Sequence, residues 1–181
     1  MREGKAANAF PFFNAKNKEE IKMLKDFYAD LEAAKPAEEL ARNVLASLAP
    51  GYEFKDVSYE TQCYYKGDIK ATAPDGQEFY IDVKNDSRIA ETRNILCEEE
   101  VYYKDSNYFG KGNMQSDYDY LCIVSESEQR LYIVDFRKLK EIYKEKGKYK
   151  IIKHYDQDTF CYLVPLHVAN KYGALIHKIN Y

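Results

Sequence analysis

Two strand-like segments joined by a tight turn constrain this chain more than any other feature. Residues 67–73 and 78–85 alternate apolar and polar side chains, and the turn between them, residues 74–77, reads Pro-Asp-Gly-Gln. Proline presets φ for a turn and glycine tolerates positive φ, so these four residues favour a hairpin. Because successive side chains of a strand point to opposite faces, we expect two antiparallel strands, each with one buried and one polar face.

The polar face of this hairpin carries a specific set of charges. On the second strand, Asp82 and Lys84 share the face opposite the apolar Ile81 and Val83. Depending on the register, the hairpin brings Asp68 of the first strand beside Asp82. The sequence therefore predicts two carboxylates and one ammonium group on a common surface.

These groups suit the binding of a divalent cation next to a phosphate. Magnesium takes oxygen ligands and is usually held by one or two carboxylates plus substrate phosphate. Asp68 and Asp82 would supply the carboxylates and the Val83 carbonyl a neutral oxygen. The cation acidifies a water molecule and offsets charge on the phosphate, while Lys84 would orient that water or stabilise the transition state. The alternative is that the Asp-x-Lys pattern arises by chance on a half-exposed strand.

The residues from Pro36 to Phe136 resemble the PD-(D/E)xK nuclease superfamily, also called restriction-endonuclease-like, which includes Holliday junction resolvases. Asp68 matches the first acidic position, Asp82 the second and Lys84 the lysine, while Gly67 stands where the motif has proline. The resemblance implies a metal-dependent endonuclease that hydrolyses DNA phosphodiester bonds and uses Mg²⁺ or Mn²⁺.

A second part of the resemblance lies downstream. Residues 87–98 are similar to a Ser…Thr-Gly-Asn…Glu stretch of some phage-type members, with Arg93 in place of the glycine. Residues 116–120 are similar to the Ser-x-Ala-Asp segment that opens their next strand, with Asp117 in place of the alanine. The resemblance implies that Glu98 lies near the metal; the alternative is a solvated acid within an acidic run.

A helix that begins at Pro36 is predicted to precede the hairpin, because proline suits the first helical position. At about 100° per residue, Glu38 flanks the apolar stripe of this helix and Glu39 points away from it. Resolvase-like members carry a helical glutamate that reaches the metal, which makes Glu38 the better candidate; the alternative is a first-turn partner of the helix dipole. The stripe consists of Ala37, Leu40, Ala41, Val44, Leu45 and Leu48.

The whole pattern predicts an α/β protein with a mixed central β-sheet flanked by helices. The restriction-endonuclease-like domain is expected over residues 36–181, with an apolar segment and a helix in residues 1–35 packing on it. The alternative role of that helix is a homodimer contact. Residues 86–103 are ambiguous between helix and strand, residues 105–117 read as a loop, and residues 165–178 as a last short helix.

Charge limits the partners of the chain. Its 181 residues carry a formal net charge of −3, which argues against strong nonspecific binding to nucleic acid. Basic residues do crowd residues 137–153, where Lys138 and Lys140, together with Arg88, are the candidates for contacts with a DNA backbone. The alternative is a solvated helix and loop. A second class of function is therefore a noncatalytic nucleic-acid-binding or assembly protein that retains the nuclease fold.

Cysteine usage and hydropathy bear on localisation. The four cysteines are dispersed without a Cys-x-x-Cys pair, as expected for free thiols in a reducing cytoplasm. No apolar run approaches the length of a membrane span, and no signal peptide is visible, so we expect a cytoplasmic protein without a membrane partner.

Overall fold

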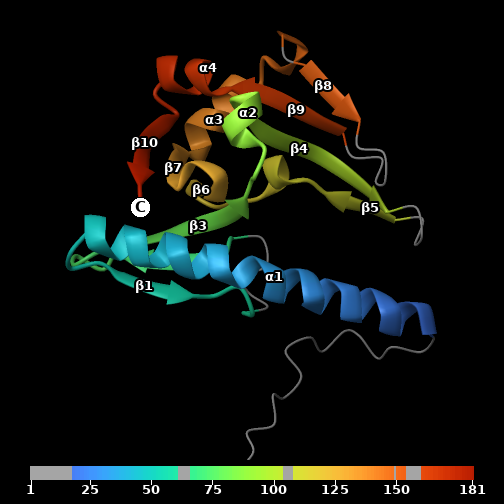
Figure 1. The fold of residues 1–181 in the computed structure, drawn as a ribbon, viewed down its shortest axis with the longest axis horizontal. Coiled ribbons are helices and arrows are strands. Elements are labelled where there is room, and N and C mark those ends of the chain that lie inside the picture. Colours follow the sequence, from blue (N-terminus) through green and yellow to red (C-terminus); the bar gives the residue numbers. More distant parts are fainter. Residues whose placement is uncertain (1–17, 61–65, 104–107, 149, 154–159) are drawn as a thin grey trace, which may run out of the picture.

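The computed structural model describes residues 18–60, 66–103, 108–148, 150–153 and 160–181. It has a six-stranded mixed sheet flanked by helices, and a four-stranded sheet packs nearby (Figure 1). The predicted α/β class with a mixed central sheet is therefore confirmed. Residues 1–17, with their expected apolar segment, lie outside the described residues.

Helices and strands alternate irregularly along the chain. The helices are α1 (Lys18–Leu48), α2 (Ile89–Thr92), α3 (Phe136–Tyr143) and α4 (Leu166–Lys171). The strands are β1 (Glu53–Asp56), β2 (Ile69–Thr72), β3 (Glu78–Asn85), β4 (Asn94–Tyr103), β5 (Tyr108–Lys111), β6 (Tyr120–Ser125), β7 (Arg130–Asp135), β8 (Lys150–Lys153), β9 (Phe160–Pro165) and β10 (Leu175–Asn180). Short 3-10 helices are η2 (Asn113–Gln115), η3 (Glu126–Glu128) and η4 (Lys146–Lys148).

The central sheet has the strand order β1-β2-β3-β6-β7-β10, and the second sheet has the order β5-β4-β9-β8. In the central sheet β3 and β6 are parallel, with Asp82 opposite Leu121, while the other neighbours are antiparallel. The hairpin of β2 and β3 is confirmed, with Ile69 opposite Ile81. The connection from β3 to β6 contains β4 and β5, so it carries the chain into the second sheet and back.

The two faces of the central sheet are covered by different elements. Helix α1 lies on one face, where Ala41 and Leu45 pack with Ile81 and Val83 (Figure 1). The other face packs against α3, α4 and strands β4 and β9 of the second sheet. Because side chains alternate along β3, Asp82 points away from α1, toward the side where the second sheet packs.

Helix α1 continues through Pro36, so the predicted start of a separate helix at that residue is wrong. The boundary expected between residues 35 and 36 therefore falls inside one helix. Proline lacks the N–H that would bond to the Glu32 carbonyl. Both residues are exposed, so water can solvate that carbonyl, and the helix loses a single hydrogen bond. Leu48, expected on the buried stripe, is instead 50% exposed.

Three further segments were assigned or corrected by the structure. Residues 86–103, ambiguous in sequence, form the short helix α2 and the long strand β4, while the expected loop at residues 105–117 contains β5 and η2. The expected last helix ends at Lys171, and β10 follows, with Lys178 opposite Tyr132 of β7. For β4, which pairs with β9, and for β10, which pairs with β7, pairing with a distant strand overrides a weak local pattern, whereas β5 pairs with the neighbouring β4. Among the described helices, none is both long and apolar enough to cross a bilayer.

Small residues on α1 let the helix approach the sheet, which generates a prediction on stability. Ala41 is fully buried against the sheet, whereas Ala46 is exposed on the same helix. We expect Ala41→Leu to lower the free energy of unfolding by about 1–3 kcal/mol, because the added methylenes overpack a closed contact. Urea denaturation measures the change, and Ala46→Leu is the matched control with an expected change below about 0.5 kcal/mol. Equal effects of the two substitutions would contradict this packing.

Candidate functional site

Two aspartates lie side by side where β2 begins. Because Ile69 is opposite Ile81 in the hairpin, Asp68, one residue before β2, lies beside Asp82. The Asp68 backbone N–H donates to the Ile81 carbonyl at 2.9 Å, and Asp68 Oδ2 accepts from the Val83 N–H at 2.8 Å. Both the backbone and the side chain of Asp68 are therefore held against the backbone of β3.

Gly67 permits this close approach of the two chains. Its φ is 111°, in the region that favours glycine. A Cβ at this position would lie 2.6 Å from the Ile81 carbonyl oxygen and 2.9 Å from the Asp82 nitrogen. Any side chain here would push Asp68 away from β3. The residue in front of the first acid is therefore determined by sterics.

Lys84 completes the predicted trio on the same face of β3. Its Nζ lies 3.2 Å from Asp82 Oδ2, and its side chain is 49% exposed, compared with 13% for Asp82. Asp82 Oδ2 itself is buried, and among the described residues it accepts no hydrogen bond of good geometry beyond this ion pair. The structure thus brings together the three residues that the sequence pattern singled out.

The electrostatics of the trio are those of two acids that share one base. Burial, and then the charge on Asp82, raise the pKa of Asp68 to about 7. Burial also raises the pKa of Asp82, although Lys84 opposes this shift. The charge of Asp82 is the largest cause that raises the pKa of Lys84 above its usual range. The ammonium therefore stays protonated, and the two buried acids tend to keep a proton at pH values where a free carboxyl group has lost it.

Glu98 reaches the same site from the second sheet. It lies on β4, and its charge helps to raise the pKa of Lys84. This effect is smaller than that of either aspartate. The backbone of β4 is clamped here, because the Glu98 N–H donates to Asn113 Oδ1 at 2.8 Å. Gly112 packs so tightly that a Cβ would overlap the Glu98 carbonyl. Sequence reasoning missed Gly112 and Asn113, since no local signal distinguishes this loop from any other.

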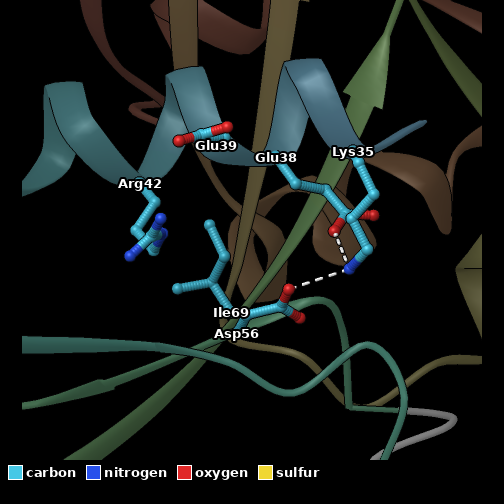
Figure 2. A pocket seen from close by; sticks show the side chains of 6 residues that line it. All are labelled: Lys35, Glu38, Glu39, Arg42, Asp56 and Ile69. Carbon is cyan, nitrogen blue, oxygen red and sulfur yellow. Dashed lines mark hydrogen bonds and ion pairs between the residues drawn. The ribbon is translucent and has the colours of Figure 1, made fainter. Parts of the chain in front are cut away.

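Glu38 is buried on α1, and Glu39 is exposed, as the helical geometry predicted. The Glu38 carboxylate forms an ion pair with Lys35 at 2.9 Å, and Lys35 also bonds to Asp56 of β1 at 2.8 Å (Figure 2). Glu38 lies close enough to Asp68 to contribute to the raised pKa of that acid. Glu38 and Asp56 share the single ammonium group of Lys35. A cavity of about 190 Å³ beside this ion pair is lined by Lys35, Glu38, Glu39, Arg42, Asp56 and Ile69.

The candidate DNA contacts lie on three different segments of the chain. Arg88 is exposed where the chain enters α2. Lys138 lies 3.8 Å from Asp135 and donates to the Gly173 carbonyl at 3.3 Å. Lys140 donates to the Ser116 carbonyl. Among the described residues, no hydrogen bond or ion pair joins these three cations to the trio, and their contact with DNA stays a prediction.

The donor set fits a hard divalent cation held by few protein ligands. In the described part of the chain, no group of three or more His, Cys, Asp and Glu side chains is arranged to hold a metal. Two neighbouring carboxylates, with Asp82 Oδ2 buried beside the Lys84 ammonium, are nevertheless a set that magnesium accepts. The Val83 carbonyl points to the β2 side, as its N–H does, and adds a neutral oxygen.

Comparisons with known proteins were made at three levels. No protein-family model, no curated protein and no solved structure matches this chain. The function is therefore inferred from the chemistry of the site.

The contact of Gly67 with β3 generates a prediction with an internal control. We expect Gly67→Ala to lower the free energy of unfolding by at least about 2 kcal/mol, because it combines positive φ with a steric clash. Gly76 has a φ of 86°, and no atom lies within 4 Å of the point that a Cβ would occupy there, so Gly76→Ala incurs the backbone cost alone, about 1 kcal/mol. Chemical denaturation measures both. Equal losses of unfolding free energy in the two variants would mean that the steric clash at Gly67 does not affect stability.

The raised pKa of Asp68 predicts a specific pH dependence of stability. Between about pH 4 and pH 7 the folded protein keeps a proton on Asp68 that the unfolded chain has lost, so the free energy of unfolding falls as pH rises through this range. Each unit of pKa difference corresponds to about 1.4 kcal/mol. In metal-free buffer, we expect Asp68→Asn to gain stability relative to the unsubstituted protein as pH rises from 4 to 7. A difference that stays constant over this range would contradict the shift.

Proposed function

We propose that this protein is a metal-dependent nuclease that hydrolyses DNA phosphodiester bonds. The observation that carries the proposal is the arrangement of Asp68 and Asp82 on neighbouring strands, with the Lys84 ammonium 3.2 Å from Asp82. Buried acids with raised pKa values beside a half-exposed cation are typical of functional sites. The site is of the PD-(D/E)xK type on the residues Asp68, Asp82 and Lys84.

The order of elements supports a restriction-endonuclease-like core as part of this proposal. Helix α1, the antiparallel strands β1 to β3, the short α2 and the strand β6 parallel to β3 follow the order that the resemblance implies. Arg93, which stands in place of a glycine of that pattern, adopts a φ of 54°, the left-handed conformation that glycine favours. The local backbone is therefore compatible with the pattern although the side chain differs.

Asp68, Asp82 and the Val83 carbonyl would hold Mg²⁺ or Mn²⁺. When bound, such a cation acidifies water and neutralises charge that develops on a phosphate. The protein's own contribution is to fix the ligands: the Val83 N–H orients the Asp68 carboxylate, and the ion pair with Lys84 orients that of Asp82. The raised pKa values of both acids mean that a bound cation also replaces protons, so binding strengthens as pH rises toward 7.

Lys84 acts as an electrostatic stabiliser in this proposal. Its raised pKa keeps the ammonium charged at neutral pH, so it is a poor proton acceptor. Its half-exposed side chain lets the charge reach a phosphate in solution. Lys66 is a second exposed cation near this end of β2, with Nζ 4.9 Å from the centre of the Tyr80 ring. The two lysines provide the positive charge that a DNA backbone requires at the site.

The test is cleavage of labelled DNA by the purified chain with Mg²⁺ or Mn²⁺. Linear duplex, branched and single-stranded substrates should be compared, with EDTA as the metal-free reference. We expect cation-dependent cleavage of at least one substrate. Asp82→Asn and Lys84→Met should each lower the rate about 100-fold or more, because each removes a charge used in the transition state.

The matched control is Lys178→Met, which removes an exposed lysine from β10 at the far edge of the central sheet. It should leave the cleavage rate unchanged, and circular dichroism should show that all variants are folded. DNA binding without cleavage under any cation would favour the noncatalytic binding protein instead. Cleavage that survives both site substitutions would identify a contaminating nuclease and overturn the proposal.

A further inference from the structure

One buried polar atom near the candidate site, the hydroxyl of Tyr118, is left without a hydrogen bond by the described residues. A second buried atom, Asp82 Oδ2, has the Lys84 ammonium at 3.2 Å but no hydrogen bond of good geometry from the described residues. Leaving a buried polar group unpaired costs about 1–3 kcal/mol, so such groups normally have a partner. The Tyr118 hydroxyl therefore calls for a partner that the described residues do not supply.

The backbone places Tyr118 between the two sheets. The next residue, Asp119, is bonded to β3 in both directions: its N–H donates to the Tyr80 carbonyl at 2.8 Å, and its carboxylate accepts from the Tyr80 N–H at 3.0 Å. Tyr118 is only 4% exposed, and its ring centre lies 3.9 Å from that of Phe136. It belongs to the core that also contains Cys97 of β4. The ring is thus fixed on the side of β3 that carries Asp82.

Acidic groups lie near the Tyr118 hydroxyl. Burial raises the pKa of Tyr118 well above its usual value, and the charges of Asp82, Glu98 and Asp68 add to the effect. The hydroxyl therefore stays protonated and can donate a hydrogen bond, while Asp82 Oδ2 can accept one in addition to its ion pair with Lys84. A group between them that accepts from Tyr118 and donates to Asp82 would give the hydroxyl the partner that the described residues do not supply.

We propose that Tyr118 is a positioning residue of the cation site, whose hydroxyl donates a hydrogen bond to a water molecule that in turn donates to Asp82 Oδ2. A water molecule satisfies both atoms at once, since it accepts one bond and donates another. This inference rests on the proposed metal site at Asp68 and Asp82. At that site Tyr118 would not contact the cation itself. It would orient the ligand Asp82 through the water molecule, as outer-shell partners commonly do.

The test measures cation affinity and needs no cleavage. Mn²⁺ is titrated into the purified chain, and free Mn²⁺ is followed by its electron paramagnetic resonance signal. We expect Tyr118→Phe to weaken Mn²⁺ binding roughly 10- to 100-fold, the usual effect of losing an outer-shell partner. The midpoint temperature of thermal unfolding should be unchanged or slightly higher, because the substitution removes a hydroxyl that lacks a protein partner.

The matched control is Tyr132→Phe. Tyr132 is fully buried in the same core, but its hydroxyl donates to Glu128 at 2.5 Å, away from the aspartates. This variant should lose some stability and keep its Mn²⁺ affinity. A structural effect of losing any buried hydroxyl in this core would instead weaken binding in both variants and overturn the inference.

The outcomes separate this inference from the proposed function. If the unsubstituted chain binds no Mn²⁺, both are wrong. If it binds Mn²⁺, Asp82→Asn abolishes the binding and Tyr118→Phe leaves it unchanged, only the role of Tyr118 is overturned. A second measurement keeps the hydroxyl: 3-fluorotyrosine placed at position 118 should show a ¹⁹F shift on addition of Mg²⁺, whereas the same label at position 132 should not. A shift that is equal at both positions would also contradict the role of Tyr118.

Discussion

The close pairing of β2 with β3 is the constraint on which the site depends. Gly67 lets the two backbones approach within a distance that no side chain would allow. The Asp68 backbone then bonds to Ile81, and its carboxylate bonds to the Val83 N–H. These contacts hold a carboxylate beside Asp82 although the two charges repel each other. The geometry of the acids is therefore a consequence of the backbone pairing.

The rest of the fold keeps this unfavourable arrangement in place. On one side of β3, α1 packs against Ile81 and Val83; on the other side, the core shared with the second sheet holds Tyr118. Burial on both sides removes the water that would otherwise solvate the acids, which is why their pKa values rise. In the proposed function, a divalent cation would displace the proton that the two acids share and stabilise both as carboxylates.

The local sequence patterns correctly predicted the features that depend on residues close together in the chain. The Pro-Asp-Gly turn and the alternation along residues 78–85 predicted the hairpin, its buried face and the grouping of Asp82 with Lys84. Helical periodicity distinguished the buried Glu38 from the exposed Glu39. The same reasoning failed at Pro36, because an exposed proline inside a long helix loses only one hydrogen bond. It also failed at β10, where pairing with β7 decides the structure.

The sequence by itself determined the class of the fold, the hairpin and the three charged residues on one face, since periodicity and turn chemistry act within a few residues. Only the tertiary structure decided which distant groups meet them. Glu98 lies on the second sheet, where Gly112 and Asn113 pack against the backbone of β4, and Glu38 forms an ion pair with Lys35. The unpaired hydroxyl of Tyr118 is likewise visible only once two sheets enclose it. Contacts between segments far apart in the chain depend on packing and strand pairing, which no local pattern records.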